Sequence, residues 1–497
     1  MTTHDQSPPA TGTPIEAPAA PVPPQSQSQS QPQPQGPAPS KAGALALAVI
    51  VTCQLMVAVD GNIVNIALPR IQSGLGFSPG GLAWVFSAYS LAFGGLLLLG
   101  GRTSDVLGRR RMFAWGLLTV VAASLLGGLA PNAGVLIAAR ALQGVGFAFA
   151  APAALSLIAV TFAEGPERNR ALGVFSTVAG LGITLGLILG GLLTTLSWRL
   201  VFFVNVPIGL AAVLLAYRHL PETAKHPGRL DVLGALTSTA GSTAVVFGLI
   251  HASSAGWGST ATVTALVLGV LLLAAFVLSQ ARVSRPLIPL SLFARRDRSA
   301  AYAVFLLLFA AMSGTYFLLS LYVQDGLGLH PLTAGLAFLP LAVAQFLTAR
   351  NASKLIPRFG AKALIVTGAA LLLADSLWLA ATGPESGYWD GLFGPLLLLG
   401  AGLGLGFVPL NMTILSGLAP KETGAASGLL QAVQQIGLSL GVAVLVTVYG
   451  RTLHGAAHPG RPELAHGLAT AVTAAAAFSG LAVLIALFVI TRTQKKN

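Results

Sequence analysis

The chain has 497 residues, of which 54% are apolar and 9% charged, and its mean hydropathy is +0.77. Because soluble domains carry about 25% charged residues, a chain of this length could not cover itself with a solvated surface, which excludes a soluble enzyme. The net charge of +13 would suit either a nucleic acid or an anionic membrane, and the positions of the charges decide between them. The only cysteine is Cys53 and the eight histidines are scattered, so no disulfide, metal site or other cofactor is predicted.

The first segment of the chain differs from all that follows it. Residues 1–40 hold 11 of the 30 prolines and seven glutamines, with almost no large apolar side chains. Such a segment cannot bury enough surface to offset the entropy of ordering. We therefore predict a disordered cytoplasmic tail over residues 1–42, without the basic and apolar regions of a cleaved signal peptide.

After the tail, the sequence becomes a succession of apolar stretches of about 20 residues, the length of helix that crosses a hydrocarbon core. Backbone groups in lipid must be satisfied within the segment, so stretches of this length indicate helices. The sequence predicts an all-α integral membrane protein with 14 transmembrane helices, at 44–68, 80–100, 112–130, 134–161, 171–195, 200–217, 232–251, 262–280, 300–322, 332–349, 363–382, 391–414, 424–449 and 468–490.

The basic residues test this division of the chain, because a miscounted span would reverse every later loop. With the N-terminus in the cytoplasm, the cytoplasmic segments hold 23 Lys and Arg and the outer loops hold four. This asymmetry predicts an even number of spans, with both termini cytoplasmic, in a bacterial cell membrane. It also explains the net charge, so no nucleic-acid partner is expected.

The loop between the second and third spans combines glycines, one acid and a basic cluster. Its spacing resembles the G-x-x-x-D-x-x-G-R-[KR] signature of the major facilitator superfamily, whose loop acts as a conformational switch. The acid can pair with the cations or with a helix N-terminus. The residues that carry the resemblance are Gly101, Asp105, Gly108, Arg109, Arg110 and Arg111.

A weaker copy of this loop occurs in the second half of the chain. Gly360 and Lys362 follow Gly108 and Arg110 by 252 residues, while Pro357 stands in the place of the acid. This repeat predicts two six-helix bundles in pseudo-repeat with two inserted helices between them. The predicted boundaries are 43–217 for the first bundle, 231–280 for the inserted pair, 299–491 for the second bundle and 492–497 for a short basic cytoplasmic tail.

Further motifs narrow the resemblance. Residues 60–69 read DGNIVNIALP and resemble the D-x-T-[IV]-V-N-V-A-L-P signature of the fourteen-span drug:proton antiporters of the EmrB/QacA type, with Asn62 in place of Thr. The sixth-span entrance, Trp198-Arg199 followed by Asn205-Val-Pro-Ile-Gly209, and the stretch at 421–428 are also similar to that family.

The fifth span carries the glycine spacing that this family associates with exchange. The family pattern places a proline where this chain has Leu187, so the expected kink is absent. Small residues at this spacing also serve helix packing, and that interpretation stays open. The glycines are Gly173, Gly182, Gly186, Gly190 and Gly191.

Three ionisable residues fall within predicted spans: Asp60, Arg140 and Asp375. A charge near the bilayer centre costs about 2.5–3.5 kcal/mol on translocon scales, so such residues usually face a cavity or a partner. Arg140 opens an R-x-x-Q-G sequence that the family links to proton transfer, and the family has an acid at the position of Asp60. We predict proton coupling at these three residues, although Arg140 could instead be a structural partner of Asp60.

Polar and aromatic side chains in an apolar cavity suit planar amphipathic compounds. The predicted cavity residues are Asn62, Asn65, Trp84, Tyr89, Gln143, Asn411, Gln431, Gln434 and Gln435, and any one of them could instead form an interhelical hydrogen bond.

The predicted function is efflux of a drug or secondary metabolite by a monomeric transporter, driven by protons through alternating access. Two alternatives stay open. The first is substrate/proton symport in the uptake direction, which Leu187 favours. The second is a membrane receptor or scaffold that keeps this fold without transporting. No nucleophile and base occur at catalytic spacing, so an enzyme is not expected.

Overall fold

The computed structural model describes residues 41–162, 166–222, 231–283, 286, 288, 290–416, 418, 420–453 and 460–491. The predicted tails at 1–42 and 492–497 lie outside this part, apart from residues 41 and 42. All regular structure in the described residues is helical, as the sequence predicts.

The first group of helices covers the predicted N-terminal bundle. Ser78 caps the second helix by accepting a hydrogen bond from the Gly81 N–H (3.1 Å), and Asn132 caps the fourth by accepting from the Val135 N–H (3.0 Å). The helices are α1 (Lys41–Leu75), α2 (Pro79–Leu107), α3 (Arg109–Gly128), α4 (Ala133–Thr161), α5 (Pro166–Leu196), α6 (Leu200–Phe203) and α7 (Asn205–His219).

An inserted pair and a second group follow. Asp231 caps the inserted pair's first helix and also accepts a hydrogen bond from Gln280 Nε2 (2.7 Å), which ties together the two helices of the pair. The elements are α8 (Val232–Ala255), α9 (Thr260–Arg282), η1 (Leu290–Phe293), α10 (Arg296–Leu321), η2 (Tyr322–Gly326), α11 (Pro331–Ala337), α12 (Leu339–Phe359), α13 (Ala361–Ala380), η3 (Tyr388–Leu392), α14 (Phe393–Leu415), α15 (Pro420–Thr452) and α16 (Arg461–Phe488).

Twelve helical segments in the described residues are long and apolar enough to cross a membrane. α2 and α5 contribute two further apolar stretches, Gly81–Leu97 and Leu185–Leu196. The all-helical membrane architecture is thus confirmed, while the total of fourteen spans stays a prediction.

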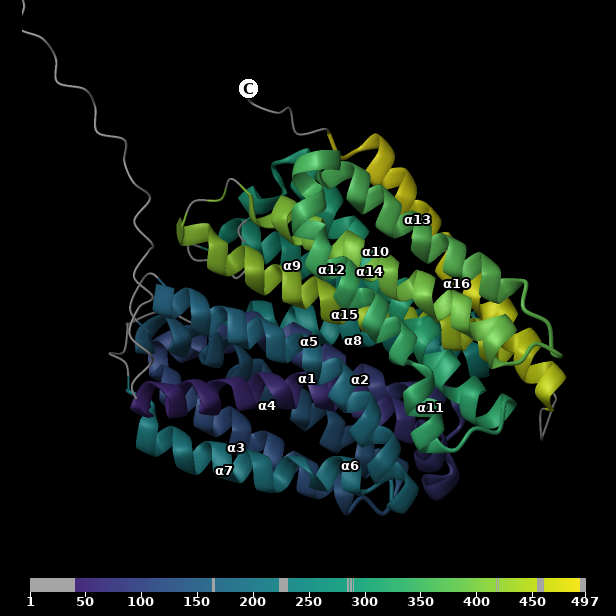
Figure 1. Cartoon of the computed structure of the whole chain (residues 1–497), viewed down its shortest axis with the longest axis horizontal. Helices are drawn as coiled ribbons and strands as arrows, with labels where there is room; N and C mark the ends of the chain where they lie inside the picture. Colours follow the sequence, from purple (N-terminus) through teal and green to yellow (C-terminus); the bar gives the residue numbers. More distant parts are fainter. Residues whose placement is uncertain are drawn as a thin grey trace, which may run out of the picture. The chain divides into compact units, whose positions relative to one another are not determined.

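The first group of helices, α1–α7 (purple to teal), and the second, α10–α16 (green to yellow), lie next to each other in Figure 1, and α2 packs against α15 between them. α8 packs against both α2 and α15, whereas α9 packs mainly against α8. Many apolar side chains of α9 are exposed, such as Val270 and Leu278, which suits contact with lipid.

Close glycine contacts repeat between the halves. A Cβ on Gly116 of α3 would lie 2.6 Å from the Gly146 carbonyl oxygen of α4, and a Cβ on Gly368 of α13 would lie 2.7 Å from the Gly402 carbonyl oxygen of α14. Gly116 and Gly368 are 252 residues apart, the same offset as Gly108 and Gly360. α3 therefore packs on α4 as α13 packs on α14.

The halves also contact each other at the end of the bundles where α1 and α5 finish. Gln324 Nε2 in η2 donates to the Ile66 carbonyl of α1 (3.0 Å). Nearby, a Cβ on Gly191 of α5 would lie 2.8 Å from Leu332 Cα of α11. The α2–α3 turn lies at the opposite end of the N-terminal helices, which we call the turn end.

Candidate functional site

Two of the predicted ionisable residues form an ion pair inside the N-terminal half. Arg140 Nη1 of α4 lies 2.6 Å from Asp60 Oδ2 of α1. Both side chains are at most 1% exposed. Separating α1 from α4 here would leave each buried charge without its partner, which is strongly unfavourable. The pair therefore links α1 to α4.

Neighbouring polar side chains complete the pair. Gln143 accepts from Arg140 Nη1 (2.8 Å) and donates from Nε2 to Asp60 Oδ1 (3.2 Å) and to Ser124 Oγ (2.8 Å). Asn205 Nδ2 of α7 also donates to Asp60 Oδ1 (2.9 Å). The sequence prediction included Gln143 but missed Ser124 and Asn205, although Asn205 lies in the motif at the sixth-span entrance.

The rest of the Arg140 guanidinium is held by α2. Its Nε donates to the Val85 carbonyl (2.9 Å), and its Cζ lies 4.4 Å from the centre of the Tyr89 ring. The Tyr89 ring packs edge-on to Phe147 at 6.1 Å and also contacts Phe93. Arg140 is therefore satisfied by an anion, an amide, a carbonyl and an aromatic face.

The R-x-x-Q-G spacing explains how α4 builds this site. Arg140 and Gln143, three residues apart, lie on one face of a helix. The following Gly144 lets α2 approach, because a Cβ there would collide with the Tyr89 carbonyl and lie 3.0 Å from the Phe93 N–H nitrogen. Close packing of α2 on α4 thus brings the Val85 carbonyl within reach of the arginine.

Asp375 belongs to a separate site. It lies on α13 in the C-terminal half and is 1% exposed. Among the described residues its Oδ1 has no hydrogen-bond partner. The structure therefore divides the three predicted coupling residues into a paired site and a lone carboxyl.

The predicted cavity residues of the N-terminal half lie in helix packing. Asn62 and Asn65 donate to the carbonyls one turn earlier on α1, at 2.7 and 3.2 Å. Trp84 contacts Phe247 of α8, with ring centres 6.3 Å apart. Together with Tyr89 and Gln143 around Arg140, these side chains are grouped by packing, and their role in substrate binding stays a prediction.

The C-terminal half presents more accessible amides. Gln431 is exposed and Gln434 half-buried within α15, while Gln435 packs against Gly94 of α2. Asn411 of α14 is also half-buried and donates to the Phe407 carbonyl (2.9 Å). Polar side chains in the middle of a membrane span usually face a water-filled cavity, which agrees with the prediction without testing it.

The α2–α3 turn is held by a residue that the sequence analysis missed. Gly108 adopts φ 107°, a conformation that favours glycine. Arg110 Nη1 donates to the Leu220 carbonyl at the end of α7 (3.2 Å). The Nε atoms of Arg110 and Arg111 lie 3.5 and 3.7 Å from Glu222 Oε2, so an acid distant in sequence pairs with the basic cluster.

The other predicted residues of this loop are Arg109, Gly101 and Asp105. Arg109 Nη1 donates to the Ser156 carbonyl of α4 at 3.4 Å. Gly101 packs near Pro152, because a Cβ on this glycine would lie 3.7 Å from the proline Cβ. The side chain of Asp105 lies outside the described part, so its predicted pairing is not tested.

The glycines of the fifth span serve packing. Cβ atoms on Gly182, Gly186 and Gly190 would meet α1, and one on Gly191 would meet α11. A Cβ on Gly173 would meet open space. Residue 187 lies in the continuous helix α5, and its carbonyl oxygen is 2.6 Å from a Cβ placed on Gly335 of α11.

Comparison with known proteins now identifies the family. The sequence profile of the Major Facilitator Superfamily matches residues 50–442. The chain belongs to this superfamily. It is 44% identical to the puromycin resistance protein pur8 of Streptomyces alboniger over 405 residues, which cover 80% of each chain. It is 41% identical to the cephamycin export protein CmcT of Amycolatopsis lactamdurans, with 81% of this chain and 84% of that protein covered.

Solved structures agree on the fold. The POT family transporter PepTSo matches with a TM-score of 0.67 at 14% identity, covering 91% of this chain and 97% of that one. The human organic anion transporter MFSD10 matches with a TM-score of 0.56 at 18% identity, covering 90% and 98%. The chain is a multi-pass membrane transporter and not an enzyme.

Proposed function

We propose that this transporter exports a small amphipathic organic compound, a drug or secondary metabolite, in exchange for protons across a bacterial cell membrane. The names of its relatives support the direction, because they include a puromycin resistance protein and a cephamycin export protein. The observation that carries the proton coupling is the buried pair of Asp60 and Arg140, whose carboxylate also accepts from Asn205.

The pair can link α1 and α4 in a way that depends on the protonation of Asp60. While Asp60 is ionised, it fixes Arg140 of α4 to α1 and accepts from Asn205 of α7. Protonation of Asp60 would leave a buried cation without its counterion, which destabilises this arrangement strongly. A second arrangement that exposes the pair to a water-filled cavity would then be favoured, so proton binding and alternating access become linked.

The position of the pair connects it to the moving halves. α1, which carries Asp60, packs along the glycines of α5 and contacts η2 of the other half through Ile66. α5 in turn packs on α11. A change in the packing of α1 on α4 would therefore alter both the Gln324–Ile66 contact and the α5–α11 contact, which lie at the end opposite the turn end.

The size of the driving force is sufficient for export. One proton crossing 100 mV supplies about 2.3 kcal/mol, and each 1.4 kcal/mol is a tenfold ratio. A neutral substrate exchanged for one proton could be held at a gradient of roughly fortyfold. Such a ratio lowers the internal concentration of a toxic compound usefully.

We further propose the fourteen-span layout of the EmrB/QacA type, six plus two plus six, with the turn end and both chain termini in the cytoplasm. The pseudo-repeat is supported by the repeated glycine contacts and by two equivalent cations. Arg110 of α3 donates to the carbonyl at the end of α7, and Lys362 of α13 donates to the carbonyl at the end of α16. The excess of Lys and Arg in the loops of that end supports the orientation. We expect a monomer to be the working unit.

Accumulation of a fluorescent planar drug in a pump-deficient bacterial host tests the proposed function. Cells that produce the wild type are expected to accumulate less drug than cells carrying an empty vector, and an uncoupler is expected to abolish the difference. Asp60→Asn is expected to behave as the empty vector, whereas Asp390→Asn, which removes an acid outside the pair, is expected to behave as the wild type. Higher accumulation in wild-type cells that falls with the uncoupler would instead show uptake, and no difference in either direction would refute transport of the compounds tested.

A further inference from the structure

The α2–α3 turn and its equivalent, the α12–α13 turn, differ in the charged groups around them. At the α2–α3 turn, a Cβ on Gly108 would lie 2.6 Å from Glu222 Oε1. The same carboxylate lies beside Arg110 and Arg111, and the N-terminus of α3 has no side-chain cap. An anion at a helix N-terminus, between cations, is electrostatically favoured. In the N-terminal half, the chain itself supplies that anion.

The equivalent turn in the C-terminal half has a similar backbone, but among the described residues no carboxylate takes the place of Glu222. Gly360 adopts φ 84°, and a Cβ there would meet no atom within 4 Å. Lys362 donates to the Leu487 carbonyl at the end of α16 (2.6 Å), as Arg110 does to the end of α7. α13 also lacks a side-chain cap. In the described part of the chain, no carboxylate forms an ion pair with Lys362.

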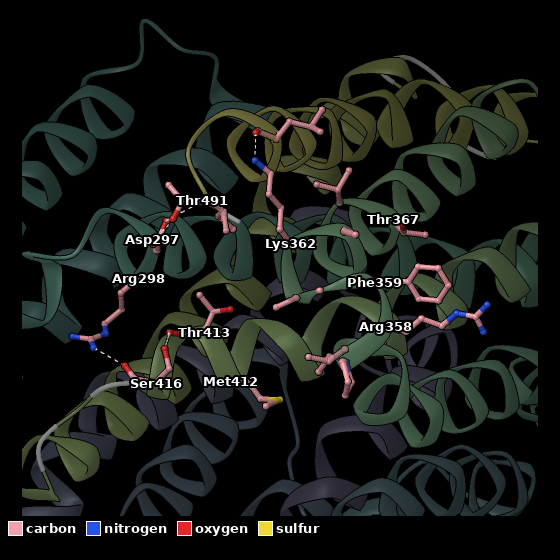
Figure 2. Close-up of a pocket in the computed structure, with 18 of the residues that line it drawn as sticks. Asp297, Arg298, Arg358, Phe359, Lys362, Thr367, Met412, Thr413, Ser416 and Thr491 are labelled. Carbon is pink, nitrogen blue, oxygen red and sulfur yellow. Dashed lines mark hydrogen bonds between the residues drawn. The ribbon is translucent and has the colours of Figure 1, made fainter. Parts of the chain in front are cut away.

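An open cavity of about 1160 Å³ lies beside this turn, lined by the ends of α10, α12, α13, α14 and α16. Figure 2 shows Asp297 and Arg298 on one side of it, Arg358 and Phe359 on the other, and Lys362 between them. The cavity is far larger than a single phosphate group needs, so it has room for a complete lipid headgroup.

The charges that line the cavity are mainly positive. Among the described residues, its cations are Arg295, Arg298, Arg358 and Lys362, and the one acid that lines it is Asp297. That acid accepts hydrogen bonds from the Thr491 N–H (2.8 Å) and hydroxyl (2.8 and 3.0 Å). Arg298, 5% exposed, donates to the carbonyls of residues 414 and 416, both at 3.0 Å. The arginine is thereby fixed in place as one wall of the cavity.

We propose that this cavity binds the phosphate group of an anionic phospholipid, which takes the place that Glu222 occupies in the other half. Residues 361–363 at the N-terminus of α13 line the cavity, and their backbone N–H groups would donate to the phosphate oxygens as at other anion-binding helix ends. Arg358 adds a second cation from α12.

A lipid fits better than a free phosphate because the cavity has an apolar edge. Phe359 and Met412 both line it and are 55% and 53% exposed. Such side chains suit contact with the glycerol and acyl portion of a lipid, whereas a hydrated phosphate ion gains nothing from them. Clusters of cations between membrane helices bind anionic headgroups in this way.

Lipid retention measures this site without requiring transport. The full chain would be reconstituted in vesicles of equal parts phosphatidylglycerol and phosphatidylcholine, extracted in mild detergent and weighed by native mass spectrometry. The wild type is expected to retain phosphatidylglycerol at least about tenfold over phosphatidylcholine, because each cation at an anionic surface contributes about fivefold. Excess inorganic phosphate is expected to leave the lipid bound.

Charge-neutral variants locate the lipid. Arg358→Gln is expected to lower phosphatidylglycerol retention about fivefold, and Lys362→Gln to do the same, with its thermal midpoint measured separately because Lys362 also caps α16. Arg350→Gln, which removes an exposed cation from the same helix outside the cavity, is the matched control and should change nothing. Equal retention of both lipids, displacement by inorganic phosphate, or an equal loss in Arg350→Gln would each overturn the proposal.

Discussion

The two halves of this transporter share a backbone plan and differ in their buried chemistry. The contacts of Gly116 and Gly368 and the turns at Gly108 and Gly360 are related by one offset in sequence. The N-terminal half encloses a fully partnered ion pair, Asp60 with Arg140, whereas the C-terminal half encloses Asp375, whose Oδ1 has no partner among the described residues.

The ion pair of the N-terminal half is hydrogen-bonded on both sides, whereas one oxygen of Asp375 in the C-terminal half has no partner among the described residues. In the C-terminal half, α10 and α14 bring three aromatic rings together. The ring centres of Phe309 and Phe407 lie 4.3 Å apart and nearly parallel, and that of Phe305 lies 4.7 Å from Phe309. The halves thus share glycine contacts and turn conformations, but a buried side-chain ion pair is found only in the N-terminal half of the described residues.

The largest effect is expected from breaking the pair on one side only. Asp60→Ala leaves Arg140 buried without its anion and is expected to cost about 3–5 kcal/mol of unfolding free energy. The double variant Asp60→Ala/Arg140→Leu removes both charges and is expected to be more stable than Asp60→Ala alone. Chemical unfolding in a mild detergent measures both. A double variant whose loss equals the sum of the losses of Asp60→Ala and Arg140→Leu, each measured alone, would contradict the pairing.

The repeated glycine contacts predict equal losses in the two halves. Gly116→Ala and Gly368→Ala both place a Cβ against backbone atoms of the neighbouring helix, so each is expected to cost about 1–3 kcal/mol. Gly383→Ala, where a Cβ meets open space, is the control and is expected to leave the thermal midpoint unchanged or raised. A loss confined to one half would argue against equivalent packing.

A smaller effect is expected at the α2–α3 turn. Glu222→Gln removes the carboxylate beside Arg110 and Arg111, but these groups are partly exposed, so the loss is expected to stay below about 1 kcal/mol and to shrink in high salt. Thermal unfolding at low and high ionic strength measures it. A larger loss that is independent of salt would show that Glu222 acts through packing and not through its charge.

The smallest effect on stability is expected at Asp375. Asp375→Asn leaves no cation without its counterion, because no ion pair involves this residue in the described part of the chain. The unfolding free energy is therefore expected to fall by less than about 1 kcal/mol or to rise. Asp60→Asn, measured alongside by chemical unfolding, is expected to be clearly less stable. If Asp375→Asn were the more damaging change, the contrast between the halves would be wrong.

The sequence predicted the parts of this molecule that depend on composition and local spacing. The helical membrane fold and the superfamily follow from apolar lengths and one loop signature. The partnership of Arg140 with Asp60 was an alternative that the sequence left open beside proton coupling. Ser124 and Asn205 could not be found in this way, because an ordinary polar residue in a span becomes part of a site only through the rotation and packing of its helix. Glu222 was missed for a related reason: its contact joins segments about 110 residues apart.

The predicted substrate-cavity residues also depend on helix rotation and packing, which the sequence does not give. Tyr89 and Gln143 are buried around Arg140, and their predicted contact with substrate stays a prediction. The aromatic group of Phe305, Phe309 and Phe407 was not predicted at all. Residue type alone does not distinguish a side chain that lines a cavity from one that supports a buried charge.

The measurement that tests the central claim most directly is transport by the purified chain in sealed vesicles with an imposed pH gradient. Wild-type protein is expected to move substrate against its concentration gradient until the pH gradient collapses. The Asp60→Asn variant is expected to lose this accumulation while still exchanging labelled for unlabelled substrate. Gradient-driven accumulation by Asp60→Asn equal to that of the wild type would contradict proton coupling at the Asp60–Arg140 pair.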